Sequence, residues 1–178
     1  MFEQIPSGQK YLTPIIEAMR DGRSLEMTYK SFWRQSRYDT EVEPYFIKVF
    51  KQRWYMIARD VSRDVMRIYA LDRIQGLSQT ENAFEVPADF SPDAYFYNAF
   101  GVIVEDACPP EIIELKVYGT QREYFRTLPL HHSQEEIDLA RTIPYSAIIW
   151  LRHMTLSRKS FPMAIMWRSN PRHISGNR

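Results

Sequence analysis

Residues 53–60 read RWYMIARD, and this stretch decides the fold. Five apolar or aromatic residues stand in a row between charged residues at both ends. A run this short and this rich in aromatic side chains is typical of a β-strand that is covered on both faces. We therefore predict a doubly covered strand at 53–60.

Short runs of apolar and aromatic residues also occur on both sides of this stretch in the sequence. Residues 25–29 (LEMTY) and 67–74 (RIYALDRI) alternate apolar and polar positions, and residues 44–50 (PYFIKVF) are strand-like after an initial proline. Polar segments such as RQSRYDTE and DVSRD separate these runs. Short strands of this kind predict a mainly β fold, a small twisted antiparallel sheet or barrel.

One short helix is predicted before the strands in the sequence and another after them. Thr13 and Pro14 are suited to the N-cap and the first helical position, and Gly22 is suited to the end of that helix. Apolar residues follow at helical spacing, namely Leu12, Ile15, Ile16 and Met19. A second, aromatic helix is predicted between Ser91 and Gly101.

Residues 106–110 (DACPP) are the best candidate for a linker, because two prolines disfavour both helix and strand. We assign residues 1–105 to a first domain and residues 111–138 to the start of a second. In the second, a strand at 111–118, a helical turn or two at 120–127 and a return toward a strand at 128–137 predict the opening of a small α+β sandwich.

Composition sets the class of protein. The 178 residues are 44% hydrophobic and 14% aromatic, which is enough for one compact domain or two small ones. No apolar run approaches the roughly 20 residues of a membrane span, and the first ten residues lack a signal-peptide core. A single cysteine, Cys108, excludes an internal disulfide and fits a reducing compartment. We expect a cytoplasmic protein with no membrane partner.

The order of the strand motifs resembles the WYL domain of bacterial transcriptional regulators. The Trp-Tyr-Leu triplet of that family stands here as Trp54, Tyr55 and Met56, and leucine to methionine nearly conserves volume. LEMTYKSF, EPYFIKVF and RIYALDRI accompany the triplet in order, and LKVYGTQREYFRTLPLHHSQEEI resembles the start of the C-terminal extension found in that family. The resemblance covers roughly residues 12–137.

This resemblance implies an SH3- or Sm-like barrel, a partial ferredoxin-like α+β extension, and a role as a sensor or nucleic-acid-contacting module. Family members normally carry a helix-turn-helix DNA-binding domain before the WYL domain, whereas some ten residues precede the first helix here. We therefore expect a truncated regulator or a stand-alone WYL protein. A separate chain would then supply the DNA-binding part, and homodimerisation stays open.

Arginine and aromatic side chains on the last of these strands favour a binding role. On an alternating strand Arg67, Tyr69, Leu71 and Arg73 share one face, with an aromatic ring between the two arginines. Guanidinium groups bind phosphate in a bidentate manner and aromatic rings stack on bases, so this face would suit a nucleic acid or a nucleotide-like ligand. With candidates from neighbouring strands, the predicted ligand-binding set is Tyr29, Ser31, Arg37, Lys48, Tyr55, Arg67 and Arg73.

Other interpretations stay open. Arg67 and Arg73 would be ordinary surface residues if they pair with nearby acids, of which the candidates are Asp64, Asp72 and Glu43. Trp54 is more typical of a core residue than of a stacking platform. The barrel would also suit a module that serves only dimerisation or partner docking.

Catalytic and metal motifs are missing from the sequence. There is no Gly-rich phosphate loop, His-Glu-x-x-His or Gly-x-Ser-x-Gly motif, and Cys108 has no local activating partner. His131 and His132 would point to opposite sides of a strand, which disfavours a shared metal site. We expect neither an enzyme nor a bound cofactor.

The C-terminal residues differ in charge from the rest. Residues 1–138 carry 16 Lys and Arg against 22 Asp and Glu, whereas residues 139–178 carry 7 Lys and Arg and no acid. Such a change at one point is a composition break. Residues 139–178 also lack the strand, helix and strand that the resemblance implies there.

A change of reading frame would explain this tail. With freely chosen synonymous codons, a shifted frame permits APYDFVTEILSHGDHVEVQSPSYFREQ, which has the implied pattern in order. We hypothesise a frameshift between about Ile137 and Tyr145, which would leave the strand at 111–118 with unpaired edges. The alternative is a genuine basic tail that binds nucleic acid or anionic surfaces.

Overall fold

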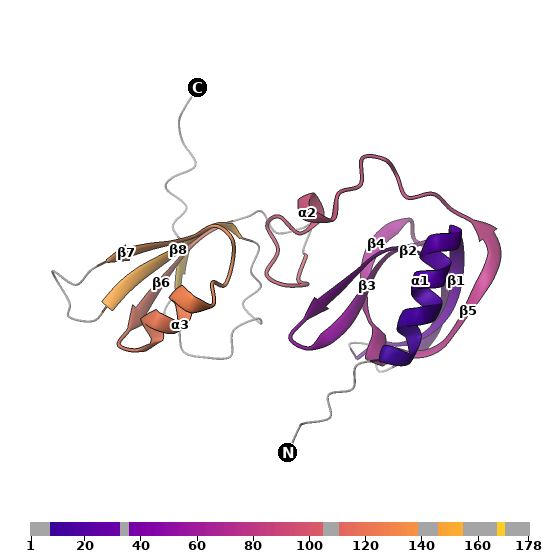
Figure 1. Ribbon diagram of the computed structural model, residues 1–178, viewed down its shortest axis with the longest axis horizontal. Helices are drawn as coiled ribbons and strands as arrows, with labels where there is room; N and C mark the ends of the chain where they lie inside the picture. The colour runs from indigo at the N-terminus through magenta and orange to yellow at the C-terminus, as the bar shows by residue number, and fades with distance from the viewer. Residues whose placement is uncertain (1–7, 33–35, 105–110, 139–145, 155–166, 170–178) are drawn as a thin grey trace, which may run out of the picture. The chain divides into compact units, whose positions relative to one another are not determined.

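The computed structural model describes residues 8–32, 36–104, 111–138, 146–154 and 167–169. The chain divides into two compact units, Met1–Pro92 and Asp93–Arg178. The predicted linker at 106–110 lies outside the described residues, so the predicted domain limits at 105 and 111 stay predictions. Each unit is described by itself below, and Figure 1 labels its elements.

The first unit begins with a 3-10 turn and a helix. η1 (Gln9–Tyr11) leads directly into α1 (Leu12–Asp21), and Gly22 ends the helix in the left-handed region at φ 59°. The helix starts one residue before the predicted N-cap, so Thr13 is helical and Pro14 lies in the first turn, where proline is tolerated. Ile15 is fully buried, which places this side of the helix against the sheet.

A five-stranded antiparallel sheet follows, in the order β4-β3-β2-β1-β5. Its strands are β1 (Arg23–Lys30), β2 (Arg37–Phe50), β3 (Arg53–Asp60), β4 (Val65–Ala70) and β5 (Ile74–Ala83). The two edge strands, β4 and β5, are separated in sequence only by the 3-10 turn η2 (Leu71–Arg73). The four Cα–Cα steps from Ala70 to Ile74 span at most about 14 Å. The sheet must therefore curl until its edges approach, and the predicted barrel-like fold is confirmed.

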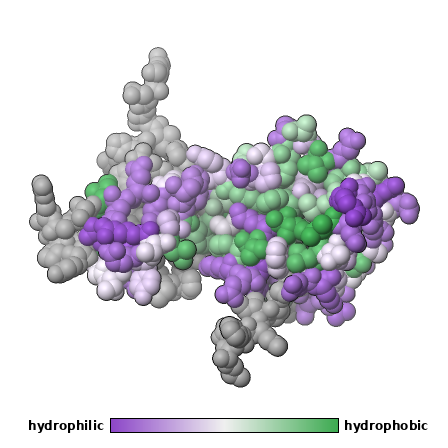
Figure 2. Space-filling view, viewed as in Figure 1, coloured by the Kyte–Doolittle hydropathy of each residue, from purple (hydrophilic) through white to green (hydrophobic). Residues whose placement is uncertain are grey.

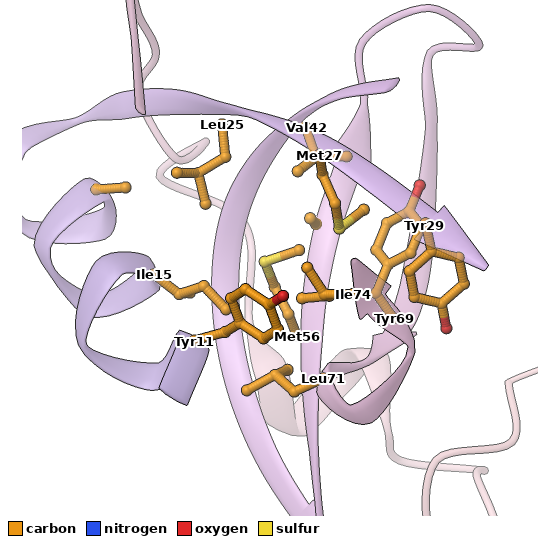
Figure 3. Packing of buried hydrophobic residues seen from close by; sticks show 12 residues of the cluster. Tyr11, Ile15, Leu25, Met27, Tyr29, Val42, Met56, Tyr69, Leu71 and Ile74 are labelled. Atoms are coloured by element: carbon orange, nitrogen blue, oxygen red, sulfur yellow. The ribbon is translucent and has the colours of Figure 1, made fainter. Parts of the chain in front are cut away.

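The core of this unit lies between α1 and the curled sheet. Figure 3 shows its side chains, with Tyr29 and Tyr69 near each other at one end. The buried cluster consists of Tyr11, Ile15, Ala18, Leu25, Met27, Tyr29, Val42, Met56, Ala58, Tyr69, Leu71 and Ile74. Trp54 is partly buried against it, in agreement with a packing role. Figure 2 shows hydrophobic residues reaching the surface between hydrophilic ones.

The second unit contains a four-stranded antiparallel sheet in the order β7-β8-β6-β9. The single helical turn α2 (Pro92–Tyr95) crosses the limit between the units. The other elements of the second unit are β6 (Glu111–Tyr118), α3 (Gln121–Thr127), β7 (Gln134–Asp138), β8 (Ser146–Met154) and β9 (Trp167–Ser169). The predicted strand, helix and strand at 111–137 are present. The helix predicted at Ser91–Gly101 is reduced to the single turn α2. β6 pairs with β8 on one side and β9 on the other, so the expectation of unpaired edges is wrong.

Candidate functional site: a tyrosine cluster flanked by arginines

Three tyrosines from three strands gather at one end of the barrel core, and we call them the tyrosine cluster: Tyr29, Tyr38 and Tyr69. Tyr29 and Tyr38 are cross-strand partners on β1 and β2, with ring centroids 5.9 Å apart. Tyr29 and Tyr69 lie edge to face at 5.1 Å. The backbone N–H of Ala70 donates to the Tyr29 hydroxyl at 3.1 Å, which ties β1 to the end of β4. These contacts hold the cluster rigid.

A buried carboxylate closes one side of the cluster. Asp60 is fully buried at the end of β3 and accepts hydrogen bonds from the Tyr69 hydroxyl at 3.2 Å and the Ser62 hydroxyl at 2.7 Å. Arg63 Nη1 lies 2.6 Å from the same carboxylate and its guanidinium stands 5.6 Å from the ring centre of Tyr38. Burial acts to raise the pKa of Asp60, but the bonds from Ser62 and Arg63 outweigh it and the pKa is lowered. Asp60 is therefore a charged anchor.

Arg67 lies on the core-facing side of β4, at its exposed end. Its cross-strand partner is Ala58, and Tyr69 follows on the same face. Arg67 Nε is 3.8 Å from Asp60 Oδ2, longer than the Arg63 contact, and its side chain is 44% exposed. This loose ion pair leaves the guanidinium accessible to a ligand.

Arg73 reaches the other side of the cluster from η2 and not from a strand. β4 ends at Ala70, so the predicted alternation from 67 to 73 is broken by the 3-10 turn. The Arg73 guanidinium stacks 4.1 Å from the centre of the Phe32 ring, and its buried Nε has no hydrogen-bond partner among the described residues. Burial raises the pKa of Tyr29, and the charge of Arg73 is the largest influence opposing that rise.

Each of the two arginines therefore influences one ring of the same pair. Burial and the Asp60 carboxylate raise the pKa of Tyr69, and Arg67 opposes this rise as Arg73 does at Tyr29. Because the Tyr29 and Tyr69 rings are 5.1 Å apart, both guanidiniums act on one small aromatic group. Tyr69 is the aromatic residue that the alternation predicted between the two arginines, and ligand binding by Tyr29, Arg67 and Arg73 stays a prediction.

The acids considered as partners of these arginines bind other residues. Asp72 pairs with Arg53 at 3.3 Å, while Glu43 and Asp64 both pair with Arg59. Arg67 instead contacts Asp60, an acid that the sequence interpretation did not consider. Arg67 therefore forms none of the ion pairs considered with Asp64, Asp72 or Glu43. Its contact is a long one of 3.8 Å with Asp60.

The remaining predicted site residues do not join this cluster. Arg37 pairs across strands with Lys30, and both are exposed on the face opposite Tyr29. Lys48 and Tyr55 are cross-strand partners beside the core pair Ile47 and Met56, so they lie on the outer face of β2 and β3.

Ser31 follows the end of β1, and its backbone N–H donates to the Ser36 carbonyl at 3.1 Å. It is half-buried and lies next to Phe32, the residue on which Arg73 stacks. Sequence reasoning missed four residues in or beside the cluster, namely Phe32, Tyr38, Asp60 and Arg63. Only Tyr38 had a usable signal, because Tyr38, Thr40 and Val42 alternate with charged residues as strand positions do.

The site combines packed aromatic rings with three guanidinium groups that are held differently: Arg63 is tightly paired with Asp60, Arg67 is loosely paired with it, and Arg73 stacks on Phe32. Such a group is suited to a ligand that carries an anion next to a planar ring. Among the described residues, no group of three or more His, Cys, Asp and Glu side chains is placed to hold a metal ion. No helix within those same parts of the chain is long and apolar enough to cross a membrane.

One family model matches the first unit. Residues 10–79 match the family model described as the WYL domain, which confirms that domain over these residues. No curated protein matches the chain.

Two solved structures are similar at low identity. Proteasome accessory factor B/C (PafBC) of Arthrobacter aurescens is 19% identical with a TM-score of 0.44, and the match covers 84% of this chain and 22% of that one. A CRISPR Cas-related protein is 13% identical with a TM-score of 0.33, and the match covers 82% of this chain and 42% of that one. This chain thus spans less than half the length of either protein.

Proposed function

We propose that this chain, whose residues 10–79 form a WYL domain, is a ligand-sensing regulatory module of a transcriptional regulator. Its ligand would be a nucleic acid or a nucleotide-like molecule bound beside the tyrosine cluster. The observation that carries the proposal is that Arg67 and Arg73 flank the Tyr29–Tyr69 pair from two elements. The role is one of binding and not of catalysis.

The chemistry of the two arginines supports an anionic ligand. Arg67 would exchange a loose contact with Asp60 for a phosphate oxygen, since a 3.8 Å ion pair is weak and partly exposed. The Arg73 guanidinium is already oriented by stacking on Phe32. A planar guanidinium that is held in place loses less entropy on binding phosphate than a mobile one.

The buried carboxylate sets a limit on the ligand. Asp60 has no exposed surface and its pair with Arg63 is short, so Arg63 is the arginine least available to an anion. A ligand with one or two phosphates would therefore be expected to bind through Arg67 and Arg73. Longer single strands would add contacts elsewhere, and Lys48 with Tyr55 on the outer face of β2 and β3 are candidates for them.

Fluorescence anisotropy with a labelled single-stranded oligonucleotide of about ten nucleotides tests the proposal, since small barrels bind about 4–16 nucleotides. We expect the Kd of the full chain to rise severalfold or more between about 50 and 200 mM salt. Arg67→Ala/Arg73→Ala should weaken binding at least about a hundredfold, because each of the two lost charged contacts is worth about 1.5–3 kcal/mol.

A matched variant removes the same charge elsewhere. Arg20 and Arg126 are exposed arginines that pair with Asp21 and Glu136, so Arg20→Ala/Arg126→Ala should leave the Kd nearly unchanged. Equal losses in both double variants would mean nonspecific attraction. Failure of the intact chain to bind would reject the nucleic-acid ligand and favour dimerisation or partner docking. Turnover of a nucleotide by the purified chain would reject the non-catalytic role.

A further inference from the structure

Gly8 packs against the backbone of η2 with no room for a side chain. A Cβ atom built on Gly8 would lie 2.2 Å from the Leu71 carbonyl carbon and 2.5 Å from the Asp72 nitrogen, both backbone atoms. Gly8 also has φ 62°, where side chains are disfavoured, and its carbonyl accepts a hydrogen bond from the Tyr11 N–H at 2.9 Å. The chain thus enters η1 in direct contact with the turn that carries Arg73.

η2 is fixed on its other sides as well. Leu71 is fully buried and Ile74 is 3% exposed, and the Ile74 N–H donates to the Leu71 carbonyl to close the turn. At the start of the turn, the Ala70 N–H is bonded to the Tyr29 hydroxyl. A three-residue turn held at both ends moves as one body. A push on the Leu71–Asp72 peptide would therefore displace Arg73.

The side chains of η2 depend on this backbone for their placement. Arg73 Nε and Asp72 Oδ1 are buried and have no hydrogen-bond partner among the described residues. The Arg73 guanidinium stacks on Phe32 and interacts with Tyr29, and a shift of the backbone would disturb both contacts. A shift of the η2 backbone would therefore move the Arg73 guanidinium out of these contacts.

We propose that Gly8 is a positioning residue for Arg73: its close contact with the Leu71–Asp72 peptide seats η2 so that the guanidinium stands beside the tyrosine cluster. The inference rests on the proposed role of Arg73 in ligand binding. The contact couples the ligand site to the segment that leads into η1. Ligand binding at Arg73 and packing of Gly8 on η2 then favour each other by the same free energy.

Another glycine provides a control. Gly119 has φ 59°, close to that of Gly8, but a Cβ built there meets nothing within 4 Å. Gly119→Ala thus imposes the same backbone strain without a collision, at a site remote in sequence from η2. Gly8→Ala imposes both. Any effect specific to Gly8→Ala arises from the contact with η2.

The test is a double-mutant cycle on binding of the labelled single-stranded oligonucleotide. We expect Gly8→Ala to weaken binding about tenfold and to lower the slope of log Kd against log salt by about one phosphate contact, with Gly119→Ala changing neither. Added to Arg73→Ala, Gly8→Ala should cost little more, whereas added to Arg67→Ala it should cost its full tenfold. A lower melting temperature with an unchanged Kd, or full additivity with Arg73→Ala, would overturn the proposal.

A second measurement needs no ligand and no variant of Gly8. If seating and Arg73 are coupled, Arg73→Ala should speed hydrogen exchange at the Tyr11 amide at least severalfold, while Arg67→Ala should leave it unchanged. Equal exchange in both variants would reject the coupling even if Gly8→Ala does not fold. If the oligonucleotide fails to bind the intact chain, the ligand proposal falls, and the exchange result alone still decides whether Gly8 positions η2.

Discussion

The Tyr69 hydroxyl donates a hydrogen bond of 3.2 Å to the fully buried carboxylate of Asp60. The carboxylate comes from the end of β3 and the hydroxyl from β4, so the bond spans the hairpin between them. Ser62 and the backbone N–H of Arg63 bind Asp60 Oδ1, while the Arg63 guanidinium binds Oδ2. The hairpin turn and the tyrosine cluster are thus organised by one acid.

Asp60→Asn should therefore destabilise the barrel. The amide keeps the size of the side chain but loses the charge that compensates Arg63, which should cost about 2–3 kcal/mol. Asp64→Asn is the control, since Asp64 is 78% exposed and should change stability by less than about 1 kcal/mol. Urea unfolding followed through the methyl signals of Met27 and Met56, both fully buried, measures both. Equal midpoints for the two variants would contradict the anchoring role.

The same carboxylate makes stability depend on pH. Because the folded pKa of Asp60 is lowered, its contribution is fully present above the unfolded value of about 3.9 and is lost as pH falls through the folded pKa. Unfolding free energy should decline less steeply below pH 4 in Asp60→Asn than in the wild type. Parallel pH profiles for the two proteins would show that Asp60 does not titrate in this way.

β3 could be predicted to the residue because its signal is local. Met56, Ile57 and Ala58 are all fully buried, so the run at 53–60 is apolar on both faces and has no competing interpretation. β2 was predicted too short. Its first residues, 37–41, read as a polar connector because charged residues face outward between Tyr38 and Thr40.

The site was predicted only in part, and the reason is tertiary. Arg67 and Arg73 were placed on one strand, whereas closure of the barrel requires the turn η2 between β4 and β5. Asp60 looked like the polar end of a strand, and its burial depends on Ser62, Arg63 and Tyr69 arriving together. No periodicity in a single sequence encodes such a convergence.

Tyr29→Phe should destabilise the barrel as well as alter the site. The phenol oxygen is the acceptor for the Ala70 N–H, and Ala70 is 2% exposed, so the variant leaves a buried amide without a partner. The expected cost is about 1–3 kcal/mol. Tyr45→Phe is the control in the same unit, because its hydroxyl makes a long 3.4 Å bond to Glu43. Urea unfolding of the two variants measures the loss of stability. An equal fall of the unfolding midpoint in Tyr45→Phe would contradict a special role for the Tyr29 hydroxyl.

His131 in the second unit should titrate below its ordinary range. Burial lowers its pKa, and the neighbouring His132 ring, 4.1 Å away, lowers it further. Nε2 lies 3.0 Å from the Tyr97 carbonyl and must donate, so Nδ1 accepts from the Ser133 N–H in the neutral ring. NMR titration of the ring protons should give a value below the ordinary 6.5.

Two consequences distinguish this from a surface histidine. His132→Gln should raise the pKa of His131, because it removes a like charge. Since the unfolded chain binds more protons below about pH 6.5, the segment should lose stability as pH falls through that value and gain it as pH rises. An unchanged His131 titration in His132→Gln would contradict the charge interaction.

Sequencing the coding DNA through codons 130–178 tests the frameshift hypothesis. The pairing of β8 with β6 and β7 does not decide it, because residues 146–151 read SAIIWL, and apolar, partly β-branched residues pair as a strand whatever their origin. The absence of any acid after residue 138 is harder to reconcile with a tail selected to fold in an otherwise acidic chain. We expect one inserted or deleted base between about codons 137 and 145 to restore the pattern that the resemblance implies. If no single-base change restores it, the basic tail is genuine, and its removal should then weaken oligonucleotide binding with a loss of salt dependence.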